Sequence, residues 1–175
     1  EAVYQWDWPS AEKQFQRGIE LKQEYAVGHH WYAINYLTPL GRFKEAQSSI
    51  QKALELEPSS LVMNSTMGLV YYFSRDFHKA IEKLEKTLQM DQDYPVTHFF
   101  LGRALVQVSR YSEAMEHFRK ALKFYGDSTN MLATFAHAAT LAGKQEITQK
   151  ILNQLQDISQ NMYVSAYDMA SIYVG

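Results

Sequence analysis

The chain has 175 residues, of which 46% are hydrophobic, 14% aromatic and 21% charged, so it has enough apolar material for a core and is not a disordered tail. Its formal net charge of −2 removes the usual electrostatic argument for binding nucleic acid or an anionic membrane. The absence of cysteine rules out a disulfide framework, a thiolate nucleophile and a cysteine-ligated metal site.

An internal repeat organises the sequence. An aromatic residue followed three positions later by a small residue recurs with a period of about 34 residues. The four copies are Trp8 with Ala11, Phe43 with Ala46, Phe77 with Ala80, and Tyr111 with Ala114. One period further along the chain, Gln145 and Thr148 form a degenerate copy.

Helical spacing of apolar residues predicts a helix over 9–21 and then four helix pairs. The pairs are 27–40 with 43–56, 61–74 with 77–90, 95–109 with 111–124, and 129–142 with 145–158. A last helix is expected from about 163, which gives about eleven helices counting partial ones and no strand. Pro39 should bend or end its helix, because it lacks a backbone donor.

Small residues recur inside the first helix of each pair, as in Met67-Gly68-x-x-Tyr71 and Leu101-Gly102-x-x-Leu105. A large side chain there would force the two helices apart. We therefore interpret the glycines, together with the alanines of the aromatic–small pairs, as packing residues.

These motifs resemble the tetratricopeptide repeat family, whose repeat unit has the same length and the same order of aromatic and small positions. The resemblance implies an all-α fold, a right-handed α-solenoid of helix-turn-helix repeats in a single array over 1–175. A partial repeat covers 1–25, full repeats cover 26–60, 61–94, 95–128 and 129–162, and a truncated repeat covers 163–175.

The chain looks like a piece of a longer protein, and we expect neither a signal peptide nor a membrane span in it. We also expect the last helix to expose Met169, Ile172 and Tyr173, and the chain to self-associate through that truncated end.

Charge is almost absent from the first helices, whose only charged residues are Arg103 and Asp168. In the family these helices line the concave surface, so the resemblance implies an aromatic, nearly uncharged groove. The expected partner-binding residues are Trp31, Asn35, Leu69, Tyr72, Phe73, Phe99, Arg103, His137 and Tyr167. Four of them should form one contiguous surface: Trp31, Tyr72, Phe99 and Arg103.

A core role competes with this interpretation, and we prefer it for Phe77, Phe118 and Phe135. For the groove aromatics both roles remain open. Arg103 can hold a carboxylate through two parallel hydrogen bonds, or it can pair with a neighbouring acceptor.

Catalytic motifs are lacking: we find no P-loop, no dinucleotide fingerprint, no HExxH and no Gly-x-Ser-x-Gly. We expect no enzyme activity, no cofactor and no metal. The histidines, among them His98 and His117, lack ligand spacing and are expected to be solvated or capped. Lys79, Lys83 and Lys86 are interpreted as a solvated face.

Three segments, 6–9, 29–33 and 163–168, resemble repeat segments of bacterial multidomain regulators that carry a winged-helix, kinase or cyclase domain. The leading hypothesis is a non-enzymatic scaffold, the C-terminal docking or sensor region of such a regulator, that binds a protein or peptide and neither nucleic acid nor membrane. The alternatives are a sensor for a small apolar or acidic ligand held by Arg103, and an accessory segment of a kinase or cyclase. We expect a cytoplasmic location, with the periplasm as the alternative.

Overall fold

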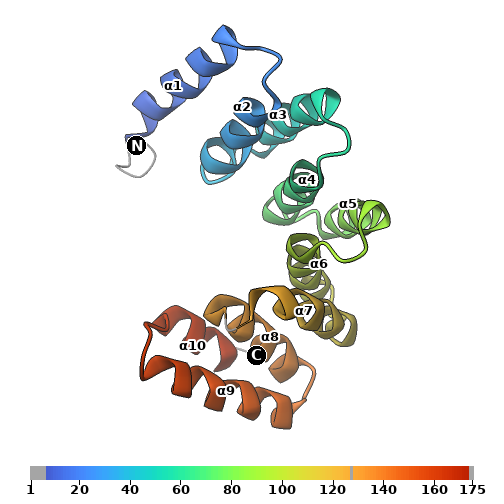
Figure 1. The fold of residues 1–175 in the computed structure, drawn as a ribbon, viewed down its shortest axis with the longest axis vertical. Helices are drawn as coiled ribbons and strands as arrows, with labels where there is room; N and C mark the ends of the chain where they lie inside the picture. The colour runs from blue at the N-terminus through green and yellow to red at the C-terminus, as the bar shows by residue number, and fades with distance from the viewer. Residues whose placement is uncertain (1–6, 127, 174–175) are drawn as a thin grey trace. The chain divides into compact units, whose positions relative to one another are not determined.

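The computed structural model describes residues 7–126 and 128–173, and within them it contains helices and no strand (Figure 1). In chain order the elements are α1 Trp8–Leu21, α2 Ala26–Tyr32, the π-helical η1 Ala33–Leu37, α3 Phe43–Leu56, α4 Leu61–Phe73, α5 Phe77–Met90, α6 Pro95–Gln107, α7 Tyr111–Tyr125, α8 Thr129–Leu141, α9 Gln145–Ser159 and α10 Ala166–Tyr173. The prediction of an all-helical chain is confirmed. The last helix begins at Ala166 rather than near 163.

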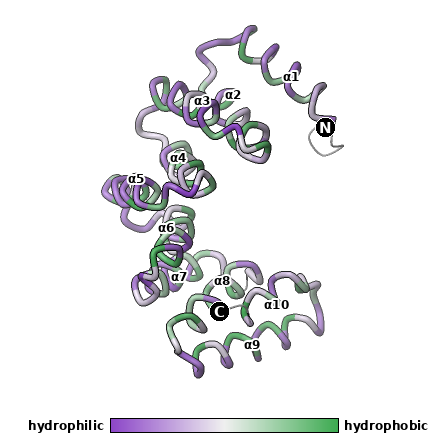
Figure 2. The backbone as a smooth tube through the Cα atoms, turned by 180° about the vertical axis from the view of Figure 1, so that it is seen from behind, coloured by the Kyte–Doolittle hydropathy of each residue, from purple (hydrophilic) through white to green (hydrophobic). Residues whose placement is uncertain are grey.

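The chain divides into two compact units, Glu1–Asp91 and Gln92–Gly175, which we call unit 1 and unit 2. In unit 1, α2 and η1 pack on α3, and α4 packs on α5; in unit 2, α6 packs on α7, and α8 on α9. Along α9 the tube alternates between hydrophilic and hydrophobic turns (Figure 2). A second helix of this kind buries its apolar stripe against its partner and leaves its polar face in water.

Small residues lie where paired helices cross, as the sequence predicted. A Cβ atom built at Gly68 would lie 2.5 Å from Cγ of Leu84, and one at Gly102 would lie 2.5 Å from Cε1 of Phe118. The second helices contribute three fully buried alanines at their own crossing points: Ala46, Ala80 and Ala114. The backbones therefore approach so closely that no larger side chain fits without displacing its neighbour.

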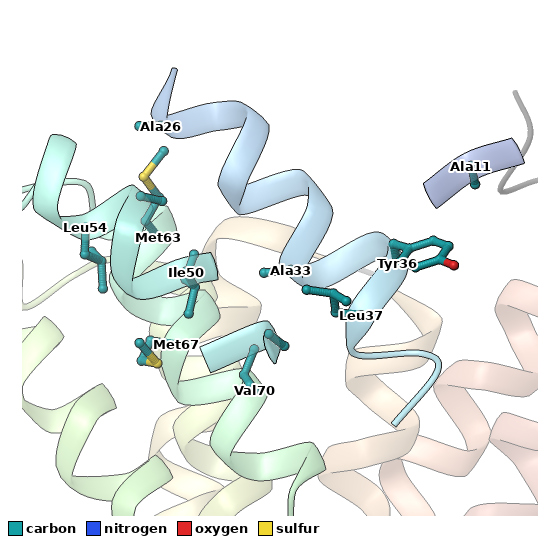
Figure 3. Close-up of a cluster of buried hydrophobic side chains, with 12 residues drawn as sticks. Ala11, Ala26, Ala33, Tyr36, Leu37, Ile50, Leu54, Met63, Met67 and Val70 are labelled. Carbon is teal, nitrogen blue, oxygen red and sulfur yellow. The ribbon is translucent and has the colours of Figure 1, made fainter. Parts of the chain in front are cut away.

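The core of unit 1 is a cluster of buried side chains from α1 to α4 (Figure 3). Ile50 and Leu54 of α3 lie between the first helix of their own pair and the following helix α4, which contributes Met63, Met67 and Val70. Within each unit one second helix packs against two first helices: α3 against α2 and α4 in unit 1, and α7 against α6 and α8 in unit 2.

Glu12 attaches α1 to the rest of unit 1. Its Oε1 accepts hydrogen bonds from the Tyr32 hydroxyl at 3.2 Å and from Nη1 of Arg42 at 2.6 Å, and its Oε2 accepts one from the Tyr36 hydroxyl at 3.2 Å. Figure 3 shows Tyr36 extending toward the segment of α1 that carries Ala11. The hydrogen-bonded guanidinium of Arg42 lowers the pKa of Glu12, so this contact is an ion pair at neutral pH.

The first helix of the first full repeat changes from α to π geometry before it ends. Both the backbone N–H and the hydroxyl of Thr38 donate to the carbonyl of Ala33, at 2.9 and 2.8 Å. The helix ends at Leu37, two residues before Pro39, which has no N–H to continue it. Of the two predicted effects of Pro39, bending or ending its helix, the structure shows the second, although the helix ends before the expected residue 40.

The turn inside every full repeat passes through one residue with left-handed backbone geometry. These residues occupy equivalent positions of successive repeats: Gly41 at φ +71°, Arg75 at +63°, Ser109 at +60° and Gly143 at +69°. Glycine adopts this geometry without steric cost, whereas a side chain makes it unfavourable. Two of the four turns therefore carry a backbone penalty.

A polar pair links the two helices of the second full repeat. Asn64 is buried; its Nδ2 donates to the carbonyls of Pro58 and Ser60 at 2.9 Å, and its Oδ1 accepts from Nζ of Lys83 at 2.6 Å. Burial lowers the pKa of Lys83, and the charge of Lys86 adds to the effect. The prediction that Lys83 belongs to a solvated face is wrong, because its ammonium group satisfies a buried amide.

The third full repeat has His98 and His117 at the positions equivalent to Asn64 and Lys83. Nε2 of His98 lies 2.8 Å from the carbonyl of Gln92, to which it can only donate, so Nδ1 of His98 accepts from Nδ1 of His117 at 2.7 Å. The histidines were predicted to be solvated or capped. This pair is not solvated, since His98 is buried and His117 half-buried, but His98 is capped through its hydrogen bond to Gln92. The fourth repeat replaces them with an apolar pair, Leu132 and Ile151.

The last helix folds back on α8, which changes what it exposes. Tyr173 is 69% exposed, but Ile172 is 1% exposed and Met169 is half-buried. The prediction that all three are exposed is therefore wrong for Ile172, because α8 covers it. Tyr167 and Tyr173 remain exposed on α10, and self-association through this end stays a prediction.

Gly102→Ala should lower the free energy of unfolding by about 1–2 kcal/mol, because overpacking against Phe118 outweighs the helix propensity that alanine adds. Gly18→Ala is the matched control. A Cβ at Gly18 meets no atom within 4 Å, so this change should raise the unfolding free energy by up to about 1 kcal/mol. Urea titrations of both variants measure the difference, and equal effects would contradict the close crossing.

Arg75→Gly should raise the free energy of unfolding by about 1 kcal/mol, because it removes the side chain from a left-handed backbone position. The reverse change, Gly143→Ala, should lower it by a similar amount. No atom lies within 4 Å of a Cβ at Gly143, so only the backbone term changes there. Thermal melts of the two variants against wild type provide the measurement; shifts of the same sign would argue against this backbone geometry.

Acid should destabilise unit 2 through His117. Burial, followed by the electrostatic interaction with His98, lowers the pKa of His117 to about 4 from an ordinary value near 6.5. The unfolded chain binds this proton first, so the stabilisation is complete above pH 6.5 and is lost as the pH falls toward 4, at up to about 1.4 kcal/mol per pH unit.

The double variant His98→Leu with His117→Ile copies the apolar pair of the next repeat and should flatten this part of the pH profile. Urea titrations between pH 7 and pH 4.5 measure the slopes. An unchanged slope in the double variant would show that other groups cause the acid sensitivity.

Candidate partner-binding faces

The nine residues predicted to bind a partner divide between the two units. Five lie on the first helices of unit 1: Trp31, Asn35, Leu69, Tyr72 and Phe73. Four lie on those of unit 2: Phe99, Arg103, His137 and Tyr167. We describe them as two inner faces, one for each unit.

The inner face of unit 1 exposes two large aromatic side chains, Trp31 at 50% and Phe73 at 42%. Tyr72 is half-buried, and its ring packs edge-on against Phe73 with centroids 5.5 Å apart. Leu69 is buried, so it supports this face from beneath. Trp31 and Phe73 are therefore the residues of this face most accessible to a partner.

A buried hydrogen bond holds the two first helices of unit 1 together behind Trp31. The hydroxyl of Thr66 donates to the carbonyl of Val62, so it accepts from Nε2 of His30 at 2.9 Å. Burial lowers the pKa of His30, which keeps the imidazole neutral. Asn35 donates to the carbonyl of Trp31 at 3.4 Å within the same helix. Trp31 thus projects from a fixed backbone.

The inner face of unit 2 combines an exposed aromatic ring with a cation. Tyr167 is 79% exposed on α10. The guanidinium carbon of Arg103 lies 5.8 Å from the ring centroid of Phe99, within cation–π range. Phe99 itself is 8% exposed and packs against Phe118, with centroids 6.0 Å apart, so it supports Arg103 from the core.

His137 lies one repeat after Arg103, at the equivalent position of α8. Its side chain is half-buried, and its Nδ1 is buried with no hydrogen-bond partner among the described residues. The other charged residue of the first helices, Asp168, is buried and accepts a hydrogen bond from Nδ2 of Asn130 at 3.2 Å. Asp168 therefore ties α10 to α8 and adds little charge to the face.

The sequence did not reveal two clefts that open between second helices. One, of about 630 Å³, is lined by residues of α1, α2, η1 and α3 in unit 1. The other, of about 410 Å³, is lined by residues of α7, α8 and α9 in unit 2. Periodicity assigns residues to a helix face, but it does not give the separation of two helices, so no sequence signal could have located these clefts.

Other kinds of site were also sought in residues 7–126 and 128–173. No group of three or more histidine and carboxylate side chains there could hold a metal ion. None of the described helices is both long enough and apolar enough to cross a membrane.

Comparison with known proteins supports the repeat architecture. Human tetratricopeptide repeat protein 13 is 32% identical over 87 residues, half of this chain and 10% of that protein. The mouse BBSome complex member BBS4 is 27% identical over 129 residues, 70% of this chain and 25% of that protein. The chain therefore spans a tenth to a quarter of these relatives.

Solved structures agree on the fold. The crystal structure of MamA superposes with a TM-score of 0.73 at 13% sequence identity, covering 91% of this chain and 95% of that one. The family model described as tetratricopeptide repeat matches residues 4–160. This match covers most of the chain, which therefore belongs to the tetratricopeptide repeat family.

Proposed function

We propose that the chain is a non-enzymatic scaffold that binds a peptide, a loop or a neighbouring domain on the inner faces of its first helices. The observation that carries this proposal is the exposure of Trp31, Phe73 and Tyr167 on helices that are nearly free of charge. Exposed aromatic residues dominate the energetics of protein interfaces, and water around them is released on binding.

The family supports this role, because tetratricopeptide repeat proteins generally act as protein-interaction scaffolds. The name of one relative, BBSome complex member BBS4, places that relative in a complex. We further propose that this chain serves as the docking region of a larger regulator.

The contact residues in this proposal are Trp31, Asn35, Tyr72 and Phe73 in unit 1, and Arg103, His137 and Tyr167 in unit 2. Leu69 and Phe99 are buried and act as their support. Arg103 lies over the ring of Phe99, and its planar guanidinium suits a partner carboxylate better than a flexible ammonium group would.

The partner can be identified by placing a photo-crosslinking amino acid at position 31 or 167 of the full-length parent and sequencing the crosslinked peptide. Titration of that peptide against Trp31→Ala and Tyr167→Ala should then show a loss of about 2 kcal/mol, roughly 30-fold in Kd, for the residue it contacts.

Phe124→Ala is the matched control, because Phe124 is an aromatic residue that is 64% exposed on the second helix α7. It should change Kd by less than about threefold. If Phe124→Ala weakened binding while Trp31→Ala and Tyr167→Ala did not, the outer helices would be the binding surface and the proposal would fail.

A further inference from the structure

The cleft of about 410 Å³ in unit 2 has apolar walls. It opens between α7, α8 and α9, on side chains that the inner faces do not use. Its apolar lining comes from all three helices: Leu122, Leu132, Phe135, Ile147 and Ile151. Its size falls within the roughly 300–1,000 Å³ of small-molecule sites.

The charged residues that line this cleft are both cations, Arg119 and Lys150, among the residues that the structure describes. The guanidinium of Arg119 lies over the ring of Phe135, 5.5 Å from its centroid, and also pairs with Glu116. No carboxylate in the described part of the chain lies within ion-pair distance of Nζ of Lys150. An apolar chamber with an available ammonium group at its rim is therefore suited to an anion with an apolar body.

The other cleft shows that this charge is not a general property of the outer helices. The cleft of about 630 Å³ in unit 1 is lined by three glutamates and one lysine: Glu20, Glu45, Glu55 and Lys52. Each glutamate is already paired, with Arg17, Arg42 and Lys52 respectively. The two clefts therefore differ in charge. Among the described residues, the cleft in unit 2 is lined by cations and by no glutamate or aspartate, whereas the cleft in unit 1 is lined mainly by glutamates.

We propose that the cleft between α7, α8 and α9 binds a free organic carboxylate with an apolar body, of the size of a medium-chain fatty acid. The apolar body would lie against Leu122, Ile147 and Ile151, and the carboxylate would lie beside Lys150 and Arg119. A macromolecular partner fits less well, because a stable protein interface buries about 800 Å² on each side, far more than one cleft of this size offers.

Decanoate below its micelle concentration is the probe, titrated by calorimetry into the whole chain, with decanol and decyltrimethylammonium as the neutral and cationic comparisons. Decanoate should bind most tightly. Lys150→Gln should weaken decanoate about three- to fivefold, as expected for one exposed ion pair, and should leave decanol unchanged. Lys123→Gln removes the same charge elsewhere in unit 2 and should change neither ligand.

Ile147→Asp tests the apolar wall. Residue 147 lies in the first turn of α9, where an acidic side chain favours the helix, so this variant should remain folded. It should weaken decanoate more than tenfold by placing a negative charge in the cleft. Gln145→Asp adds the same charge in the same turn, outside the cleft lining, and should bind decanoate like wild type.

Equal affinity for decanoate and decanol, or equal effects of Lys150→Gln and Lys123→Gln, would overturn the proposal. Preferential binding of decyltrimethylammonium would overturn it as well, as would decanoate binding that Ile147→Asp leaves intact. Because none of these variants touches the inner faces, the outcome is separate from that of the proposed scaffold function.

Discussion

The close crossing of two helices at small residues is the constraint on which the rest of the structure depends. Gly68 and Gly102 allow Leu84 and Phe118 to approach the backbone of the facing helix, and these are two of the most deeply buried side chains. Such a pair has a fixed separation, so within a unit its second helix can also pack against the next first helix, as α3 does on α4 and α7 on α8. The constant period of the sequence is the consequence of this repeated contact.

Much of the fold could be predicted from the sequence, because the crossing demands a small residue at a fixed spacing. Polar contacts could not be predicted in the same way. Lys83 and His117 have the spacing of solvated residues, yet they reach across to Asn64 and His98. Helical periodicity assigns a residue to a face, whereas a hydrogen bond depends on the distance to the facing helix and on the length of both side chains.

The candidate site was predictable in part for the same reason. The sequence located the first helices correctly, but it did not show which of their side chains are exposed. Trp31 and Tyr167 are exposed, whereas Leu69 and Phe99 are buried. Phe99 is buried because Phe118 of the paired helix lies beside it, a contact that the aromatic spacing does not show. Ile172 is buried because α10 lies on α8, which no local pattern indicates.

Departures from the repeat show where this chain differs from a generic scaffold. Thr148 stands where the other second helices have a fully buried alanine, and its hydroxyl lies 3.2 Å from that of Thr140. The same repeat has Leu132 and Ile151 in place of a polar pair, and both side chains line the apolar cleft of unit 2. Because this repeat has no polar link, its two helices meet through apolar side chains that also form part of the cleft wall. The inner faces, by contrast, owe their chemistry to residues that the repeat leaves unconstrained, such as Trp31 and Arg103.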